Sequence, residues 1–165
     1  SARFNASTQV NVLVLNRLRK VATECVIELL ATLVEEHRHH PALSGDPRQR
    51  LFDALDQLEA RLARQRYLFG SQFVETDWRL FVTLVRFDAV YHGHFKCNLR
   101  RIIDYPNLFG YLKDLYQTDG IADTVNFDHI KRHYYVTHDD INPTRIVPLG
   151  PDQDLTAPHG RELIQ

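Results

Sequence analysis

The stretch that decides the fold runs over residues 75–91 and reads ETDWRLFVTLVRFDAVY. Its apolar side chains leave few faces for water when the segment is drawn as an α-helix. We therefore expect a helix that runs through the centre of the domain. The apolar positions that support this prediction are Trp78, Phe81, Val82, Leu84, Val85 and Val90.

Two further helices are predicted before this stretch. Residues 7–37 carry apolar side chains at steps of three and four, Cys25 among them, which places one apolar stripe on a helix. A second helix starts at Asp46-Pro47, because aspartate caps free amides and proline suits the first turn. It stops near Gln65, and so short a leucine seam is typical of a helical bundle rather than a coiled coil. The seam consists of Leu51, Leu55, Leu58 and Leu62.

The chain after residue 91 predicts two more helices and a tail. Pro106 opens a helix that closes near Gly120, and another helix is expected over residues 123–133. After Thr137, repeated prolines remove hydrogen-bond donors, so this part should lie over the surface as an irregular tail. The sequence has no strand pattern, and the predicted fold class is an all-α helical bundle.

Composition is that of an ordinary globular domain. The 165 residues are 44% hydrophobic and 25% charged, with a formal net charge of -1, which favours neither nucleic acid nor a membrane as a partner. No apolar run approaches the roughly 20 residues of a membrane span, and no signal peptide is evident. The two cysteines form no CxxC pair, so we expect a reducing, cytoplasmic location. Since the chain has no methionine, we expect a fragment, a processed piece or a trimmed chain.

Local motifs suggest a family. The segment RYLFG at residues 66–70, followed by ETDWRL at 75–80, resembles the C-terminal domain of glutathione transferases. In that superfamily an aspartate near the start of the buried central helix belongs to a capping box, and Asp77 matches it. The cap position holds Val74 instead of serine or threonine. Valine cannot accept a hydrogen bond, which should cost about 1 kcal/mol.

A more specific resemblance follows from ordered pieces between about residues 51 and 161. They include LVRFDAVY at 84–91, HFKC at 94–97, DYPNL at 104–108, TVNFDHI at 124–130, HYY at 133–135 and PHGR at 158–161. Together they are similar to the glutathionyl-hydroquinone reductases, the xi class of omega-like glutathione transferases. The resemblance implies one glutathione transferase C-terminal-like domain over residues 1–165. Within it, 1–45 form a divergent helix and loop, 46–137 a helical core, and 138–165 an extended tail.

The resemblance also implies a chemistry. Members of this family remove glutathione, their co-substrate, from glutathionyl-hydroquinones. A cysteine of an N-terminal thioredoxin-like domain, which also binds most of the glutathione, attacks the glutathionyl sulfur. We expect that domain to be supplied in cis or in trans, because no Cys-Pro turn is present here; no catalytic residue is therefore assigned in this chain. The helical domain supplies the wall for a quinol-type aromatic ring, and a homodimer is expected.

Tyr134 is the substrate-binding candidate. It matches the first tyrosine of the family's His-Tyr-Tyr piece, and a phenol can hold a hydroquinone oxygen while charge develops on the ring. The structural alternative is a tyrosine with a buried ring and a hydroxyl at the rim. Cys97 and Cys25 are expected to be packed rather than catalytic. The family uses an additional, earlier tyrosine, whereas this chain has none before Tyr67, which puts the pocket in doubt.

Histidines and basic pairs offer weaker candidates. His129 and His133 stand four residues apart beside Asp128, with His138 beyond, a spacing that can hold zinc. The resemblance accounts for them without a metal, so no metal site is predicted. The remaining candidates are expected to be solvated surface: His37, His39, His40, Arg100-Arg101 and Lys131-Arg132. Two further hypotheses for the whole chain are a non-catalytic dimerisation or docking module and an inert gene fragment.

Overall fold

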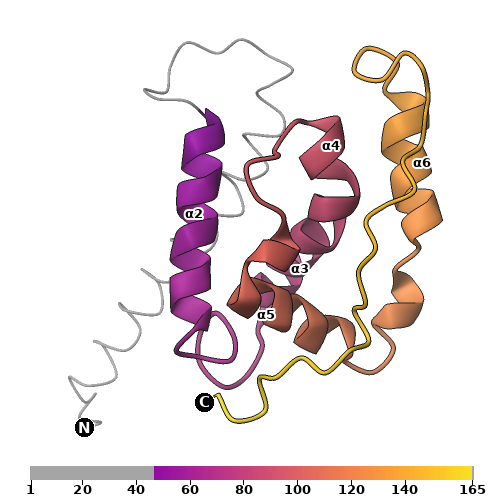
Figure 1. The fold of residues 1–165 in the computed structure, drawn as a ribbon. Coiled ribbons are helices and arrows are strands. Elements are labelled where there is room, and N and C mark those ends of the chain that lie inside the picture. Colours follow the sequence, from indigo (N-terminus) through magenta and orange to yellow (C-terminus); the bar gives the residue numbers. More distant parts are fainter. Residues whose placement is uncertain (1–46, 165) are drawn as a thin grey trace, which may run out of the picture.

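The computed structural model describes residues 47–164. The helix predicted over residues 7–37, which includes Cys25, lies outside these residues, and so do His37, His39 and His40. Four helices build the described part (Figure 1): α2 (Pro47–Leu62), α3 (Glu75–Arg86), α5 (Pro106–Tyr116) and α6 (Phe127–Thr137). Short elements join them: a π-helical turn (Phe87–Tyr91), α4 (His92–His94), and 3-10 turns at Ile102–Asp104 and Ala122–Thr124. Residues 47–164 contain no β-strand, so the all-α prediction is confirmed.

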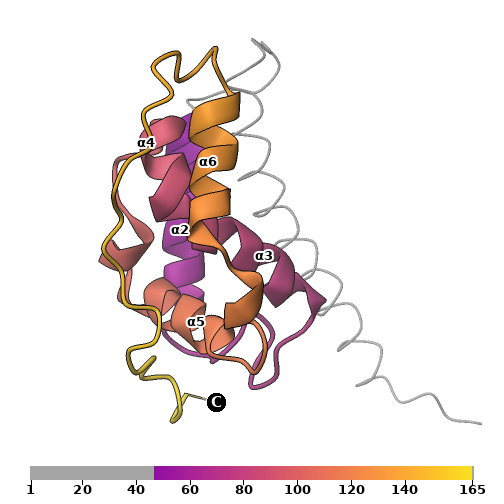
Figure 2. The same ribbon diagram turned by 90° about the vertical axis from the view of Figure 1, so that its right-hand side faces the viewer.

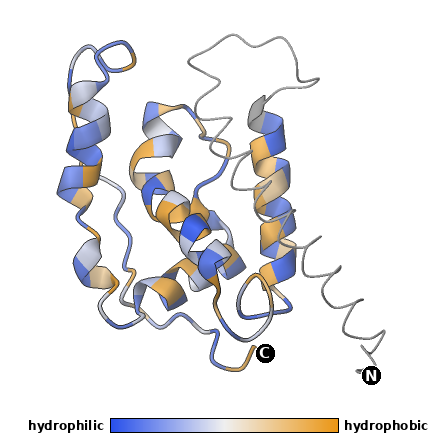
Figure 3. Ribbon diagram, turned by 180° about the vertical axis from the view of Figure 1, so that it is seen from behind, coloured by the Kyte–Doolittle hydropathy of each residue, from blue (hydrophilic) through white to orange (hydrophobic). Residues whose placement is uncertain are grey.

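Helix α2 packs against α5. Apolar and polar residues occupy different sides of α2 in Figure 3, and the seam leucines Leu51, Leu55, Leu58 and Leu62 are buried, as predicted. From the polar side Glu59 reaches the start of α5, where its carboxylate accepts from the backbone amides of Asn107 at 3.0 Å and Leu108 at 2.7 Å. A carboxylate at this end is favourable because the first amides of a helix have no partner within it.

Asp77 organises the start of α3. Val74 occupies the N-cap position without a side-chain hydrogen bond, as its hydrocarbon side chain dictates. The Asp77 carboxylate accepts from the Val74 amide at 2.8 Å, from the Leu68 amide at 3.0 Å and from the Tyr111 hydroxyl at 2.8 Å. One buried group thus joins the helix start to the preceding turn and to α5.

The central helix extends beyond its predicted end. Residues 75–91 were expected to form it, but after Arg86 the backbone widens into the π-helical turn and then continues as α4 to His94. Asp88 in this turn accepts from the Ile102 and Ile103 amides at 2.6 and 3.2 Å, which attaches the following loop. Single π-turns inside helices are frequent at functional sites.

Both ends of α6 and the end of α5 differ from the predictions. The helix expected over residues 123–133 begins four residues later, because Asn126 is the N-cap and its side chain accepts from the His129 amide at 2.9 Å. The Ala122–Thr124 turn precedes it, and α6 ends at Thr137. Helix α5 ends at Tyr116 rather than near Gly120, which has a φ of 76° in the following turn.

Residues 138–164 of the tail form no helix or strand, as predicted, and run back along the domain from α6 to α5 (Figures 1 and 2). Lys131 is not simply solvated, since its ammonium donates to the carbonyls of Pro148 and Leu149 at 3.1 and 3.0 Å. At the far end the Arg161 side chain is buried against α2 and α5. A Cβ at Gly110 would lie 2.9 Å from the His159 carbonyl oxygen, so glycine permits this approach.

Candidate functional site

Tyr134 lies on α6 within a cluster of rings from α6, α4 and the π-turn. Its ring meets Tyr91 edge-on, with centroids 5.9 Å apart and an angle of 84°, and Phe95 at 5.9 Å and 87°. The centroid of the His138 ring lies 5.4 Å from that of the Tyr134 ring. Tyr134 itself is half-buried. We call this group the Tyr134 cluster; its members are Tyr91, His94, Phe95, His133, Tyr134 and His138.

Burial raises the pKa of the Tyr91 hydroxyl well above its usual value, and the neighbouring Tyr134 hydroxyl adds to the shift. The charge of Arg86 acts in the opposite direction on the same group. Tyr91 therefore stays protonated at neutral pH. A protonated phenol can donate one hydrogen bond and accept others, so Tyr91 can polarise or position the Tyr134 hydroxyl next to it.

A histidine pair borders the cluster. His94 is 2% exposed, and its Nε2 lies 3.2 Å from Nδ1 of His138, so one ring must donate and the other accept. On the same side the Tyr135 hydroxyl donates to the Val90 carbonyl at 3.4 Å. A Cβ at Gly93 would lie 2.8 Å from that hydroxyl, which explains glycine there. The sequence pointed to Tyr134 but did not predict that Tyr91 and His94 lie beside it. His94 does belong to the HFKC piece that the chain shares with the family.

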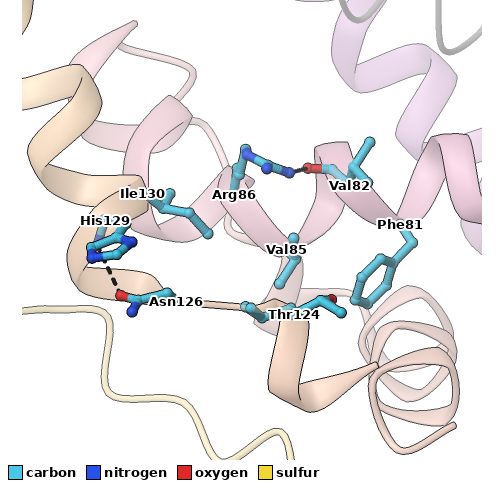
Figure 4. Close-up of a pocket in the computed structure, with 9 residues that line it drawn as sticks. Phe81, Val82, Val85, Arg86, Thr124, Asn126, His129 and Ile130 are labelled. Carbon is cyan, nitrogen blue, oxygen red and sulfur yellow. Dashed lines mark hydrogen bonds between the residues drawn. The ribbon is translucent and has the colours of Figure 1, made fainter. Parts of the chain in front are cut away.

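A pocket of about 260 Å³ opens between α3 and the start of α6. Figure 4 shows Arg86 and Val82 on the α3 side of the pocket and Asn126, His129 and Ile130 on the α6 side, with the Arg86 side chain extended toward the Val82 carbonyl. Tyr134 does not line this pocket, but it follows Ile130 by one helical turn on the same face of α6. The lining residues are Phe81, Val82, Val85, Arg86, Thr124, Val125, Asn126, His129 and Ile130.

Of the other candidates, His129 lines the pocket, whereas Asp77 and Cys97 lie outside it. Asp77 is fully buried at the start of α3. Cys97 is a buried thiol whose Sγ lies 3.9 Å from the Phe95 carbonyl oxygen, an environment typical of packed rather than reactive cysteine. Within residues 47–164, no three His, Cys, Asp or Glu side chains gather closely enough to hold a metal ion.

The three arginines of the basic pairs are exposed, as expected, and each also makes an ion pair. Arg100 pairs with Asp56 at 2.8 Å and also lies over the Tyr105 ring at 4.7 Å. Arg101 pairs with Asp104 at 2.8 Å, and Arg132 with Asp128 at the same distance. A search for a membrane-spanning helix over the described residues finds none of sufficient length and apolarity.

A family comparison matches residues 28–114 to the model "Glutathione S-transferase, C-terminal domain". Among curated proteins, the chain is 56% identical over 114 residues to glutathionyl-hydroquinone reductase YqjG of Escherichia coli, covering 69% of this chain and 35% of that protein. It is 56% identical over 105 residues to glutathionyl-hydroquinone reductase PcpF of Sphingobium chlorophenolicum, covering 64% of this chain and 34% of that one. The chain thus spans about a third of the length of these curated relatives.

Solved structures show the same likeness in three dimensions. The glutathione-bound structure of Escherichia coli YqjG matches with a TM-score of 0.79 and 41% identity, over 99% of this chain and 52% of that one. A xi-class glutathione transferase from Natrialba magadii matches with a TM-score of 0.78 and 45% identity, over 88% and 45% of the two chains. The resemblance inferred from the sequence motifs is confirmed.

Proposed function

We propose that this chain, which belongs to the glutathione S-transferase C-terminal domain family, is the aromatic-substrate domain of an enzyme that removes glutathione from glutathionyl-hydroquinones. The observation that supports this proposal is the Tyr134 cluster. A half-buried tyrosine stands among rings from α4, α6 and the π-turn, with a second, protonated tyrosine at its side. The same tyrosine belongs to the motif shared with the glutathionyl-hydroquinone reductases.

Tyr134 would act on the oxygen of the quinol ring. When the bond between ring and sulfur breaks, negative charge develops on the ring, and a phenol O–H within hydrogen-bond distance of a ring oxygen stabilises that charge. Tyr91 can donate to Tyr134 and so strengthen Tyr134 as a donor. The edge-on rings of Tyr91 and Phe95 hold the Tyr134 side chain in place, which reduces the entropy lost when a substrate binds.

The remaining chemistry would come from outside these residues. Cys97 is buried, and we propose that the attacking thiolate comes from a thioredoxin-like domain, in cis or in trans, which would also bind most of the glutathione. Relatives include a glutathione-bound structure. We further propose a homodimer in the reducing cytoplasm, with the whole of residues 1–165 acting as one domain.

The test is a titration of the 165-residue chain with menadiol and with glutathionyl-menadiol under anaerobic conditions, followed by tyrosine and Trp78 fluorescence. Saturable binding is expected, and Tyr134→Phe should weaken it about five- to tenfold, the usual effect of losing one hydrogen bond to a partly charged group. Tyr116→Phe is the matched control, because Tyr116 is also partly buried but ends α5, outside the cluster.

Two results would overturn the proposal. One is the absence of binding by a chain whose circular dichroism shows it to be folded, which would favour a docking module instead. The other is an equal effect of the Tyr134→Phe and Tyr116→Phe substitutions, since Tyr134 would then have no special contact with the ring.

A further inference from the structure

We infer that the pocket between α3 and the start of α6 binds an aromatic ring carrying a sulfonate or carboxylate, with Arg86 as its counter-ion. This inference goes beyond the proposed function. It concerns a pocket that Tyr134 does not line, and it stands or falls separately from the quinol site.

The size and lining of the pocket suit an aromatic ring. Phe81 and Val85 are buried in its wall, Val125 and Ile130 are partly buried on the α6 side, and Val82 is 48% exposed. Cavities of about 150 Å³ with apolar walls hold benzene, so about 260 Å³ offers space for a ring with a substituent or for two fused rings. An exposed valine beside buried apolar groups gains from such a ligand because its surface leaves water.

Arg86 supplies the charge. It is partly exposed and lines the pocket, and its Nη1 donates only to the Val82 carbonyl of its own helix (Figure 4). Among residues 47–164, no carboxylate forms an ion pair with it. Six other arginines of the described residues do have such partners: Arg66 with Asp114, Arg79 with Glu75, Arg100 with Asp56, Arg101 with Asp104, Arg132 with Asp128 and Arg145 with Asp139. Arg61 and Arg161 donate to backbone carbonyls, as Arg86 does, but neither lines the pocket.

The guanidinium therefore keeps donors for a ligand at the edge of an apolar wall. Arginine suits this role because its planar fork matches a carboxylate or sulfonate with two parallel hydrogen bonds. His129 and Asn126 form the polar rim opposite. The Asn126 side-chain oxygen is used to cap α6, which leaves its amide group to face polar atoms of a ligand. Apolar walls with one fixed charge are the usual composition of small-molecule sites.

The test compares two probes by calorimetry with the 165-residue chain: naphthalene-2-sulfonate and the uncharged naphthalene-2-sulfonamide. We expect the sulfonate to bind about tenfold more tightly, as a charge-assisted hydrogen bond provides, and this advantage should shrink with added salt. Arg86→Gln should abolish the advantage, and Arg86→Lys should retain part of it. Arg79→Gln is the matched control, since Arg79 lies on the same helix but is paired with Glu75 outside the pocket.

The place where the sulfonate binds is determined by NMR. On its addition, the backbone amide chemical shifts of residues 81–86 and 124–130 should change. The inference is overturned if the two probes bind equally, or if Arg86→Gln and Arg79→Gln have the same effect in chains with wild-type circular dichroism. It is also overturned if the shifts move elsewhere. Loss of quinol binding in Tyr134→Phe with unchanged sulfonate binding would leave this pocket intact and bear only on the proposed function.

Discussion

Asp77 shows how one residue can replace a missing helix cap. Val74 cannot accept a hydrogen bond from the first amides of α3, and the Asp77 amide turns to the Val74 carbonyl at 3.0 Å instead. The Asp77 carboxylate, 0% exposed, gathers donors from Val74, Leu68 and Tyr111. A buried carboxylate is tolerated when its oxygens are this well satisfied. The helix start is therefore held from two other parts of the domain.

Asp77→Asn should destabilise the domain by about 2–4 kcal/mol. The substitution replaces one accepting carboxylate oxygen by an amide N–H₂ group, which would then point at a hydrogen-bond donor. Urea unfolding followed by circular dichroism measures the change. Asp119→Asn is the control, since Asp119 is exposed and should shift the free energy of unfolding by less than about 0.5 kcal/mol. Equal effects of the two substitutions would refute the role given to Asp77.

The sequence identified single important residues, but it did not predict which other side chains they contact. The motif singled out Asp77 and Tyr134, but the bond between Asp77 and Tyr111 joins residues 34 positions apart. The contact of Tyr91 with Tyr134 likewise joins α6 to the π-turn. Such pairs depend on how helices cross, which no local pattern encodes.

The bounds of a helix were predicted well where residues of that helix determine them. They were predicted less well where contacts with other parts of the domain determine them. The α2 seam and the Pro106 start followed from spacing and from proline. The π-turn after Arg86 did not, since it adds a residue to a helix that otherwise continues. The start of α6 was placed at Asp123, whereas Asn126 caps the helix. Both residues are good caps, so spacing alone did not separate them.

The empty cap of α3 provides a test at the scale of one helix. Val74 has the extended backbone of an N-cap residue, with φ -129° and ψ 175°. Val74→Ser should therefore add a side-chain acceptor for the amides of the first turn of α3. We expect the serine variant to be about 1 kcal/mol more stable than Val74→Ala, which removes the same methyl groups without adding an acceptor. Thermal or urea unfolding compares them, and an alanine variant as stable as the serine variant would contradict the prediction.

In the whole molecule, the tail closes the domain through Arg161. This side chain is 1% exposed and donates to the carbonyls of Gln65 at 2.7 Å, Arg66 at 2.8 Å, Leu62 at 2.9 Å and Asn107 at 3.3 Å. The end of α2 thereby gains donors for carbonyls that have no partner within the helix. Burial lowers the pKa of Arg161, opposed by the charge of Asp114, yet an arginine stays charged at neutral pH.

Arg161→Met should cost about 3 kcal/mol of unfolding free energy, since it leaves buried carbonyls without a donor. It should also expose the tail to proteolysis before the helical core unfolds. Arg145→Met is the control, because Arg145 forms an exposed pair with Asp139 and such pairs contribute little. A tail equally resistant to protease in both variants would show that Arg161 does not anchor it.

At the scale of the molecule the sequence identified the family and the all-α class, because its motifs are ordered pieces that few folds share. The tail was expected to be irregular, but its attachment was not foreseen. Arg161 and Lys131 bind backbone carbonyls far away in the chain, and a carbonyl acceptor leaves no trace in a sequence. The pocket beside Arg86 was missed for a related reason, as Val82 was expected to be covered and is exposed.

The proposed function rests on Tyr134 meeting the quinol ring, and a crystal structure of the 165-residue chain with menadiol, prepared anaerobically, tests this most directly. We predict the ring against the Tyr134 cluster, with one ring oxygen within about 3 Å of the Tyr134 hydroxyl. A menadiol bound without contact to that hydroxyl would contradict the role given to Tyr134.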